Sequence, residues 1–192
     1  MSASELGNAS GLEGYSGRSD PSVVRWFVAY TKARHEKKAA SYLQMKEVEV
    51  FLPLYKTTHL WNGRRAVLDL PLFPGYVFVR TSLQDRLRVL EAPSVLQLVN
   101  SRGLPIPLPD AEVEQLRTCL SLGLEAAPAP YLNTGDLVRI ADGPLAGWNG
   151  RVIRRDGEMR FVLSVDLIMR SVEVKIEGSR LERLCTAHTA AA

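Results

Sequence analysis

The nine residues from Pro71 to Val79 (Pro-Leu-Phe-Pro-Gly-Tyr-Val-Phe-Val) constrain the fold of this chain more than any other stretch, because they form its most hydrophobic run. The aromatic and β-branched residues from Tyr76 onward are typical of a strand. Successive side chains of a strand point to opposite faces, so both faces of this one are apolar. Pro74 cannot donate a hydrogen bond to a neighbouring strand, which places the start of the strand or a bulge near Gly75.

Two interpretations follow from the apolar faces of this strand. In the first, it is a central strand that the protein itself covers on both sides. In the second, one face, led by Phe73, Tyr76 and Phe78, stays open to bind a partner protein. The stretch by itself leaves both possibilities open.

Composition places the chain among soluble globular proteins. Its 192 residues allow one domain or two small ones, and 46% are hydrophobic while 23% are charged. No segment approaches the roughly 20 apolar residues that cross a membrane, and the N-terminus does not have the pattern of a secretory signal. The two cysteines, Cys119 and Cys185, lie far apart in the sequence. This usage fits a reducing compartment, so we expect a cytoplasmic protein in which the Cys119 thiol is buried.

The first two thirds of the chain alternate strands with helices. Residues 1–22 are rich in Ser, Gly, Asn and Ala, which is typical of a disordered leader. Beyond them the periodicity predicts strands over residues 26–30, 50–55, 76–79 and 95–99, and helices over residues 33–46, 83–91 and 109–123, the first with an apolar stripe of Ala39, Ala40 and Leu43. Turns are predicted over residues 61–65, which include Asn-Gly, and at Arg102 and Gly103. Gly123 is expected to cap the last helix. This order describes an α+β domain over residues 25–123.

Basic residues gather at the start of the first predicted helix, interrupted only by Glu36: Lys32, Arg34, His35, Lys37 and Lys38. Cations at a helix start oppose the helix dipole, so helix stability does not explain them. They are either a solvated face or a patch that contacts phosphates. Residues 25–123 carry 14 Lys and Arg against 9 Asp and Glu, whereas residues 133–184 carry 9 against 8. A contact with nucleic acid is therefore expected in the N-terminal part.

The texture of the sequence changes after residue 123. Residues 124–132 contain two prolines and are expected to be a short, stiff linker. Short strands are then predicted around residues 138–140, 152, 161–165 and 172–176. Closely spaced strands of this kind indicate a small, bent barrel over residues 133–184, followed by a flexible tail over residues 185–192.

A strand, a glycine-rich loop and a second strand form the most specific motif of the chain, and five of its residues are Gly135, Asp136, Gly143, Gly147 and Gly150. The loop glycines supply backbone conformations that are costly for residues with a Cβ. A phosphate-binding loop is not indicated, because no Gly-Lys-Ser/Thr and no helix follow. The spacing and residue types resemble the KOW motif, which occurs in small barrels of transcription factors and ribosomal proteins.

Four segments of the N-terminal part resemble the amino-terminal NGN domain of the NusG family of transcription elongation factors: Trp26–Tyr30, Arg34–Lys38, Val50–Leu54 and Leu72–Val79. The resemblance covers residues 25–184, with the linker and the barrel in the order that the family has. It implies an α+β fold: an antiparallel sheet with flanking helices, joined by a short linker to an SH3-like KOW barrel.

The resemblance also implies partners. An apolar concavity of the family docks onto the clamp helices of the RNA polymerase largest subunit, and the matching residues here are Val28, Tyr30, Phe73, Pro74 and Tyr76. The basic residues that would face upstream or non-template DNA are Lys32, Arg34, His35 and Lys38. A monomer without cofactor or metal is implied.

The predicted barrel departs from the family pattern in one place. Housekeeping members carry a Phe-Gly-Arg…Thr-Pro-Val-Glu segment, tied to contacts with the termination factor or a ribosomal protein, where this chain has Leu167–Glu173. The chain is in this respect similar to specialised paralogues that act as antiterminators on particular long operons. Some of these refold their barrel into helices. The alternation of apolar and charged residues from Val172 to Ile176 predicts a permanent barrel instead.

Two other classes of function are less well supported. A ribosomal-type RNA-binding protein would share only the KOW barrel, and a nearly neutral barrel is not typical of such proteins. An enzyme would need a catalytic constellation, and the sequence has no paired carboxylates at a convincing spacing, no nucleophile with a base and no cluster of metal ligands. His35, His59 and His188 are scattered in polar or terminal settings. We therefore expect a protein without enzymatic activity.

Overall fold

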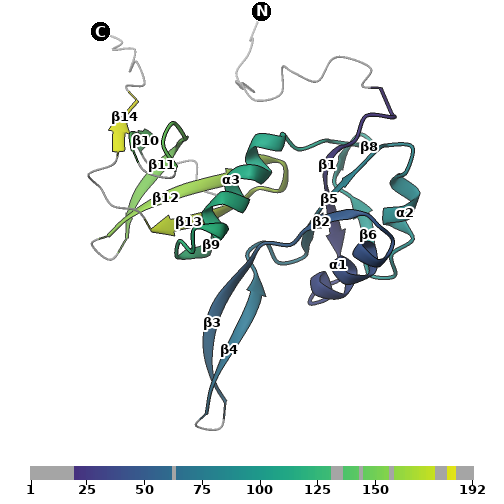
Figure 1. Cartoon of the computed structure of the whole chain (residues 1–192), viewed down its shortest axis with the longest axis horizontal. Coiled ribbons are helices and arrows are strands. Elements are labelled where there is room, and N and C mark those ends of the chain that lie inside the picture. The colour runs from purple at the N-terminus through teal and green to yellow at the C-terminus, as the bar shows by residue number, and fades with distance from the viewer. Residues whose placement is uncertain are drawn as a thin grey trace, which may run out of the picture.

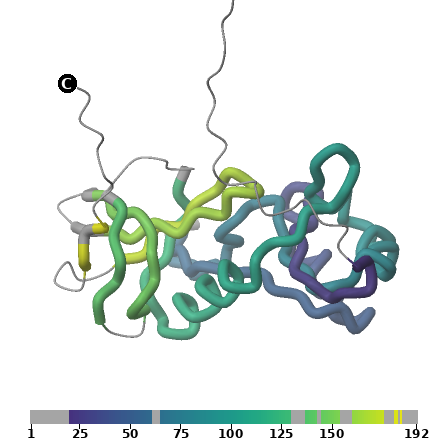
Figure 2. The backbone as a smooth tube through the Cα atoms, turned by 90° about the horizontal axis from the view of Figure 1, so that it is seen from above, coloured from purple at the N-terminus to yellow at the C-terminus, as the bar shows by residue number. Residues whose placement is uncertain are grey.

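The computed structural model describes residues 20–61, 64–130, 136–142, 145–155, 158–175 and 181–184. An α+β N-terminal domain and a β-rich C-terminal domain meet at helix α3 (Asp110–Ser121), as Figures 1 and 2 show. The predicted leader lies outside the described residues as far as residue 19, and the predicted tail over residues 185–192 lies wholly outside them.

A four-stranded antiparallel sheet forms the centre of the N-terminal domain. Its strands, in spatial order, are β2 (Glu49–Phe51), β5 (Tyr76–Thr81), β1 (Arg25–Thr31) and β6 (Val95–Leu98). The register of β1 and β5 sets Val28 opposite Phe78 and Tyr30 opposite Tyr76. The strand predicted from Tyr76 onward is therefore a central strand with a neighbour on each side.

Helices cover both faces of this sheet. Helices α1 (Glu36–Met45) and α2 (Arg86–Leu90) lie over one face, where the predicted apolar stripe of α1 packs on the strands; the buried residues there include Phe27, Ala29, Ala39, Ala40, Leu43, Val77, Val79 and Val89. Helix α3 covers the opposite face, where Trp26, Val28 and Phe78 are buried with Val113. Each apolar face of the sheet is thus covered by the apolar side of a helix.

The segment predicted as one strand over residues 50–55 is two strands. Strand β2 ends at Phe51 and β3 (Leu54–Trp61) begins after Pro53, which has no N–H to donate to a sheet. Strands β3 and β4 (Arg64–Pro71) then form a two-stranded ribbon that extends away from both domains in Figure 1. The predicted Asn-Gly turn at the tip of the ribbon lies outside the described residues.

A second, short hairpin joins β7 (Asn100–Ser101) to β8 (Leu104–Pro105). Its two turn residues, Arg102 and Gly103, have φ angles of 51° and 82°. Positive φ at both central positions is the geometry of a type I′ turn, which suits the twist of a hairpin. The turn predicted at these two residues is therefore present.

The end of α3 has the cap that Gly123 predicts. Gly123 has a φ of 65°, and its N–H donates to the carbonyl of Leu120 at 3.1 Å, while the N–H of Leu124 donates to the carbonyl of Cys119 at 3.3 Å. This pair of bonds is a Schellman motif, which turns the chain sharply out of a helix. The chain leaves α3 in a fixed direction, towards the C-terminal domain.

Six antiparallel strands form the C-terminal domain, in the order β14 (Leu181–Arg183), β10 (Asp136–Ile140), β11 (Asn149–Arg155), β12 (Glu158–Val165), β13 (Arg170–Lys175) and β9 (Ala126–Pro130). The short 3-10 helix η1 (Asp166–Ile168) connects β12 to β13. The four strands predicted from the sequence correspond to β10, β11, β12 and β13. Strand β13 holds the segment whose alternation predicts β-structure, although Ile176 lies outside the described residues.

Strand β9 occupies most of the segment that the sequence predicts as a linker. Residues 126–130 pair with β13, with Ala126 opposite Val174 and Pro130 opposite Arg170. Proline is tolerated on the edge strand of a sheet, where every second N–H points away from the neighbouring strand. The prolines that suggest a stiff tether belong to an edge strand, so α3 leads into the C-terminal sheet across only residues 122–125.

The glycines of the KOW motif have different roles. Gly147 has a φ of 87°, as the motif predicts, and its N–H donates to the carbonyl of Ile140 at 2.8 Å. Gly150 is needed for space: a Cβ there would lie 2.3 Å from Cζ of Phe161, a fully buried side chain. Asp136 is the first residue of β10. Gly135 and Gly143 lie outside the described residues.

Replacement of Gly150 by Ala should therefore destabilise the C-terminal domain. The Phe161 ring has no room to move in a packed core, and overpacking of this kind costs about 1–3 kcal/mol. Urea unfolding followed by tryptophan fluorescence measures the loss. Asn149→Ala, a change at an exposed neighbour in the same strand, is the control and should change the free energy of unfolding by less than about 0.5 kcal/mol. Equal stability of the two variants would contradict the close packing of Phe161 on Gly150.

Candidate functional site

The five residues predicted to bind polymerase divide into an exposed group and a buried group. Tyr30 is 39% exposed, Pro74 is exposed and Tyr76 is half-buried. Val28 is fully buried and Phe73 is 1% exposed. The interpretation of Phe73 as part of an open face is therefore wrong for this structure: its ring packs edge-on against Phe78, with centroids 5.5 Å apart.

A tight turn presents the exposed group. The N–H of Tyr76 donates to the carbonyl of Phe73 at 3.1 Å, and Gly75, the third residue of this turn, has a φ of 86°. Proline in the second position and a glycine with positive φ in the third are the signature of a type II turn. A Cβ on Gly75 would also approach the Tyr30 ring to 3.3 Å, so only glycine lets Tyr30 lie against the turn.

Two hydrogen bonds hold this turn in place. The carbonyl of Gly75 accepts from the N–H of Thr31 at 2.8 Å, and the N–H of Gly75 donates to Oε1 of Glu36 at 2.7 Å. Glu36 is 5% exposed and begins α1, where the helix dipole favours its negative charge. The sequence does not predict this role, because Glu36 stands out there only as an acidic residue within a basic cluster.

The exposed residues form one surface, which we call the aromatic surface: Tyr30, Pro74 and Tyr76. Tyr30 and Tyr76 are opposite each other in the sheet, and their ring centroids are 5.5 Å apart with an interplanar angle of 46°. Amphipathic aromatic rings of this kind, held on a rigid sheet, suit recognition of another protein.

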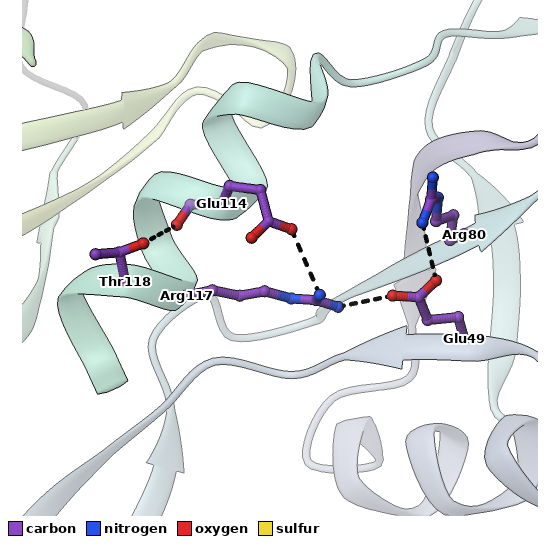
Figure 3. Close-up of polar contacts among 5 residues, drawn as sticks. All are labelled: Glu49, Arg80, Glu114, Arg117 and Thr118. Atoms are coloured by element: carbon purple, nitrogen blue, oxygen red, sulfur yellow. Dashed lines mark hydrogen bonds and ion pairs between the residues drawn. The ribbon is translucent and has the colours of Figure 1, made fainter. Parts of the chain in front are cut away.

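Helix α3 stops short of the aromatic surface, and Arg117 fixes where it lies. The guanidinium of Arg117 lies 4.8 Å from the centroid of Trp26 and 5.2 Å from that of Phe51. It also pairs with Glu49 at 3.0 Å and with Glu114 at 3.4 Å (Figure 3). Trp26 is at the start of β1 and Tyr30 near its end. Arg117 therefore holds α3 over the start of the strand, away from Tyr30.

The predicted DNA-binding residues directly follow the aromatic surface, in the loop over residues 32–35 and the first turn of α1. We call residues 32–38 the basic turn. Lys32, Arg34, His35 and Lys38 are all exposed, and no salt bridge joins them to a carboxylate within the described part of the chain. The N–H of Lys32 donates to the carbonyl of Ser94 at 2.9 Å, and that of His35 to the carbonyl of Lys32 at 3.1 Å. These bonds fix the turn, so the structure brings the two predicted sites together at one end of β1.

Two further features border this basic turn. Arg34 has a φ of 61°, a left-handed conformation that is uncommon for residues with a side chain and that Arg102 also adopts in the β7–β8 turn. A pocket of about 340 Å³ lies between α1 and residues 93–94, and its lining includes Lys38, Tyr42 and Met45. The basic turn thus borders a pocket, and its own basic side chains are exposed to solvent.

The described residues contain no arrangement that resembles a catalytic or metal centre. Within them, no group of three or more His, Cys, Asp and Glu could hold a metal ion. Burial raises the pKa of the Cys119 thiol to about 12, so this thiol is a poor nucleophile. His35 and His59 are exposed, and His188 is outside the described residues. Among the described helices, none is long and apolar enough to span a membrane.

Comparison with known proteins agrees with this geometry. The model of a family described as "Transcription termination factor nusG" matches residues 24–117. The transcription termination/antitermination protein NusG of Yersinia pestis is 30% identical over 179 residues, which cover 86% of this chain and 99% of that protein. NusG of Vibrio cholerae is 29% identical over 180 residues, with 86% and 99% covered. A solved structure described as "Domain interaction in Thermotoga maritima NusG" has the same fold, with a TM-score of 0.57 at 21% identity, covering 84% of this chain and 98% of that one.

An NGN-type α+β domain followed by a β-rich domain defines a two-domain transcription factor. This chain belongs to the NusG family, and its role is that of a NusG-type transcription factor.

The anchoring of the aromatic surface can be tested by removal of the Glu36 carboxylate. In Glu36→Ala the buried N–H of Gly75 loses its acceptor, which should cost about 1–3 kcal/mol and speed the hydrogen exchange of the Gly75 amide. Native-state exchange measures the effect. Glu91→Ala removes an exposed carboxylate from the same domain and should leave that amide protected. Unchanged Gly75 exchange in Glu36→Ala would contradict the anchoring role.

Proposed function

We propose that this NusG-type factor binds RNA polymerase through the aromatic surface and promotes processive elongation and antitermination. The observation that carries the proposal is the pair Tyr30 and Tyr76, exposed on a rigid sheet at the end that α3 leaves uncovered. Val28 and Phe73 support the surface from below instead of touching the partner.

The clamp helices of the polymerase largest subunit are the partner we propose for this surface. A helical partner lays its apolar side chains against an apolar surface, and a few aromatic anchors supply most of the affinity. Tyr30 and Tyr76 have the size and partial exposure of such anchors, and Pro74 adds an apolar edge. The family resemblance of these positions supports the same assignment.

The basic turn would contact upstream or non-template DNA at the same time. Lys32, Arg34, His35 and Lys38 follow Tyr30 along the chain, so docking of the aromatic surface brings these residues to the nucleic acid that leaves the polymerase. Their contacts would be with phosphates, which give affinity without sequence information. A factor that touches both the clamp and the DNA stabilises the closed, elongating state over paused states, a population shift without chemistry. We therefore propose a protein without enzymatic activity.

The C-terminal domain would recruit a further partner. Its surface differs from the housekeeping pattern at residues 167–173, where Met169 is 58% exposed with a φ of 51° and Glu173 is buried beside Arg160. This difference favours a specialised factor that acts on particular operons. We propose that the factor acts in the cytoplasm and as a monomer. The alternative is a housekeeping factor of the same family, whose C-terminal domain contacts the ribosome or the termination factor.

Replacement of Tyr30 by Ala should weaken binding to purified RNA polymerase. Loss of an aromatic anchor costs about 2 kcal/mol or more, which corresponds to at least roughly 30-fold in Kd. Leu104→Ala, at a 73% exposed residue of β8, is the matched control and should bind normally. Phe73→Ala is unsuitable as a test, because removal of a buried ring costs about 3–5 kcal/mol of stability. Unweakened binding of Tyr30→Ala would show that the docking surface lies elsewhere.

Charge reversal in the basic turn should weaken the contact with DNA and leave the contact with polymerase intact. We expect Lys37→Glu with Lys38→Glu to reduce crosslinking to upstream DNA and to lengthen pauses, more clearly at low salt because screening weakens phosphate contacts. Lys56→Glu, on the exposed ribbon, is the control for the loss of a positive charge. If pause lifetime and crosslinking stay the same in the double variant, the turn does not contact DNA.

A further inference from the structure

Helix α3 buries two different stripes of side chains. Arg117 lies on the ring of Trp26, and Val113 and Leu120 share its side of the helix, which faces the N-terminal sheet. Glu112, Leu116 and Cys119 follow the spacing i, i+4, i+7 and form a second stripe. The apolar side chains of η1, Leu167 and Ile168, belong to the same hydrophobic cluster as α3. Asp166, in the same 3-10 helix, acts electrostatically on Glu112, so the second stripe lies beside η1. We call this region between the second stripe and η1 the seam.

Glu112 is a carboxyl group in surroundings that do not suit a charge. Its Oε2 atom is buried and has no hydrogen-bond partner among the described residues. Asp166 of η1 acts on it from the C-terminal domain, with a charge of the same sign. One turn further along α3 lie Gln115 and Leu116, which carry no charge that could compensate.

The described face of β1 that α3 covers supplies no compensating charge either. The β1 side chains on the face that α3 covers are Trp26 and Val28, both apolar. Burial, and to a smaller extent the charge of Asp166, raises the pKa of Glu112 to about 7. The start of a helix normally stabilises a negative charge, so the loss of hydration outweighs the helix dipole here.

We propose that Glu112 makes the packing of the two domains depend on protons: the seam stays closed while this carboxyl is protonated and opens more readily once it ionises. Opening lets water reach Glu112 and increases its distance from Asp166. It therefore reduces both the desolvation and the repulsion that make an ionised Glu112 unfavourable in the closed state. Arg117 keeps α3 on the N-terminal sheet, so the C-terminal domain is the part that moves away.

The direction of the pH dependence follows from the raised pKa. A carboxyl whose pKa is higher in the closed state favours that state most at low pH, and this preference is lost as the pH rises. The loss begins near the ordinary value of 4.5 and is nearly complete above about 7. The opening of the seam would set how freely the C-terminal domain reaches its partners.

Cys119 reports on the seam in the intact chain. It lies on the same stripe as Glu112, is 2% exposed, and can react with a thiol reagent only when the stripe becomes accessible. We therefore propose to measure its labelling rate in full-length Cys185→Ser protein, without polymerase, relative to the rate of a free thiol at each pH. The relative rate gives the opening equilibrium. It should rise about tenfold between pH 6 and pH 8 for one linked carboxyl with the stated pKa values.

Three variants in the same background decide the question. Glu112→Gln keeps the shape of the side chain without the charge and should abolish the pH dependence. Asp166→Asn should reduce it, because one of the two causes of the raised pKa is removed. Asp110→Asn, at an exposed carboxyl on the same helix, should behave as the parent protein does.

Either of two results would overturn the proposal. The first is a pH dependence in Glu112→Gln as large as in the parent, or no pH dependence in the parent. The second is an opening free energy equal to the free energy of global unfolding in urea, which would mean that Cys119 is exposed only when the whole chain unfolds. Because polymerase is absent, neither result depends on whether the aromatic surface binds it.

Discussion

Strands β1 and β5 are apolar on both faces, and this constraint determines where the helices pack. Each face has to be covered, so α1 and α2 pack on one side and α3 on the other. Helix α3 has 12 residues, a length of about 18 Å, and Arg117 fixes it over the start of β1. The cover runs out before Tyr30. A surface for a partner therefore exists because Arg117 holds α3 over one end of this apolar face, whereas Tyr30, at the other end, is exposed.

The sequence was sufficient to predict features that depend on local patterns. The apolar residues from Tyr76 onward identified a strand, the stripe of α1 identified its buried face, and Gly123 identified the cap of α3. The family resemblance placed Val28, Tyr30, Phe73, Pro74 and Tyr76 in one concavity. The register of β1 and β5 sets Tyr30 opposite Tyr76, whereas Val28 and Phe73 are buried. Patterns of this kind arise from neighbours along the chain, so they can be read without knowledge of the fold.

What the sequence could not predict depends on contacts between distant segments. The burial of Phe73 follows from its packing on Phe78, and the anchoring role of Glu36 follows from a hydrogen bond to a residue 39 positions away. The tether expected after residue 123 is a strand, because β13 offers an edge that the sequence alone does not reveal. A proline-containing segment can be either a stiff tether or an edge strand, and only the presence of a partner strand decides between the two.

The two prolines of β9 also protect this protein from aggregation through its sheet edge. The carbonyl of Glu125 accepts from the N–H of Lys175, so Ala127 and Ala129 direct their polar groups towards β13, and Pro128 and Pro130 occupy the alternate positions on the outer side. There the outer rim of the sheet lacks the N–H donors that another strand would need. An edge without donors is a poor template for the growth of intermolecular sheets, which would otherwise be a hazard for a small, strand-rich domain at the high concentrations inside a cell.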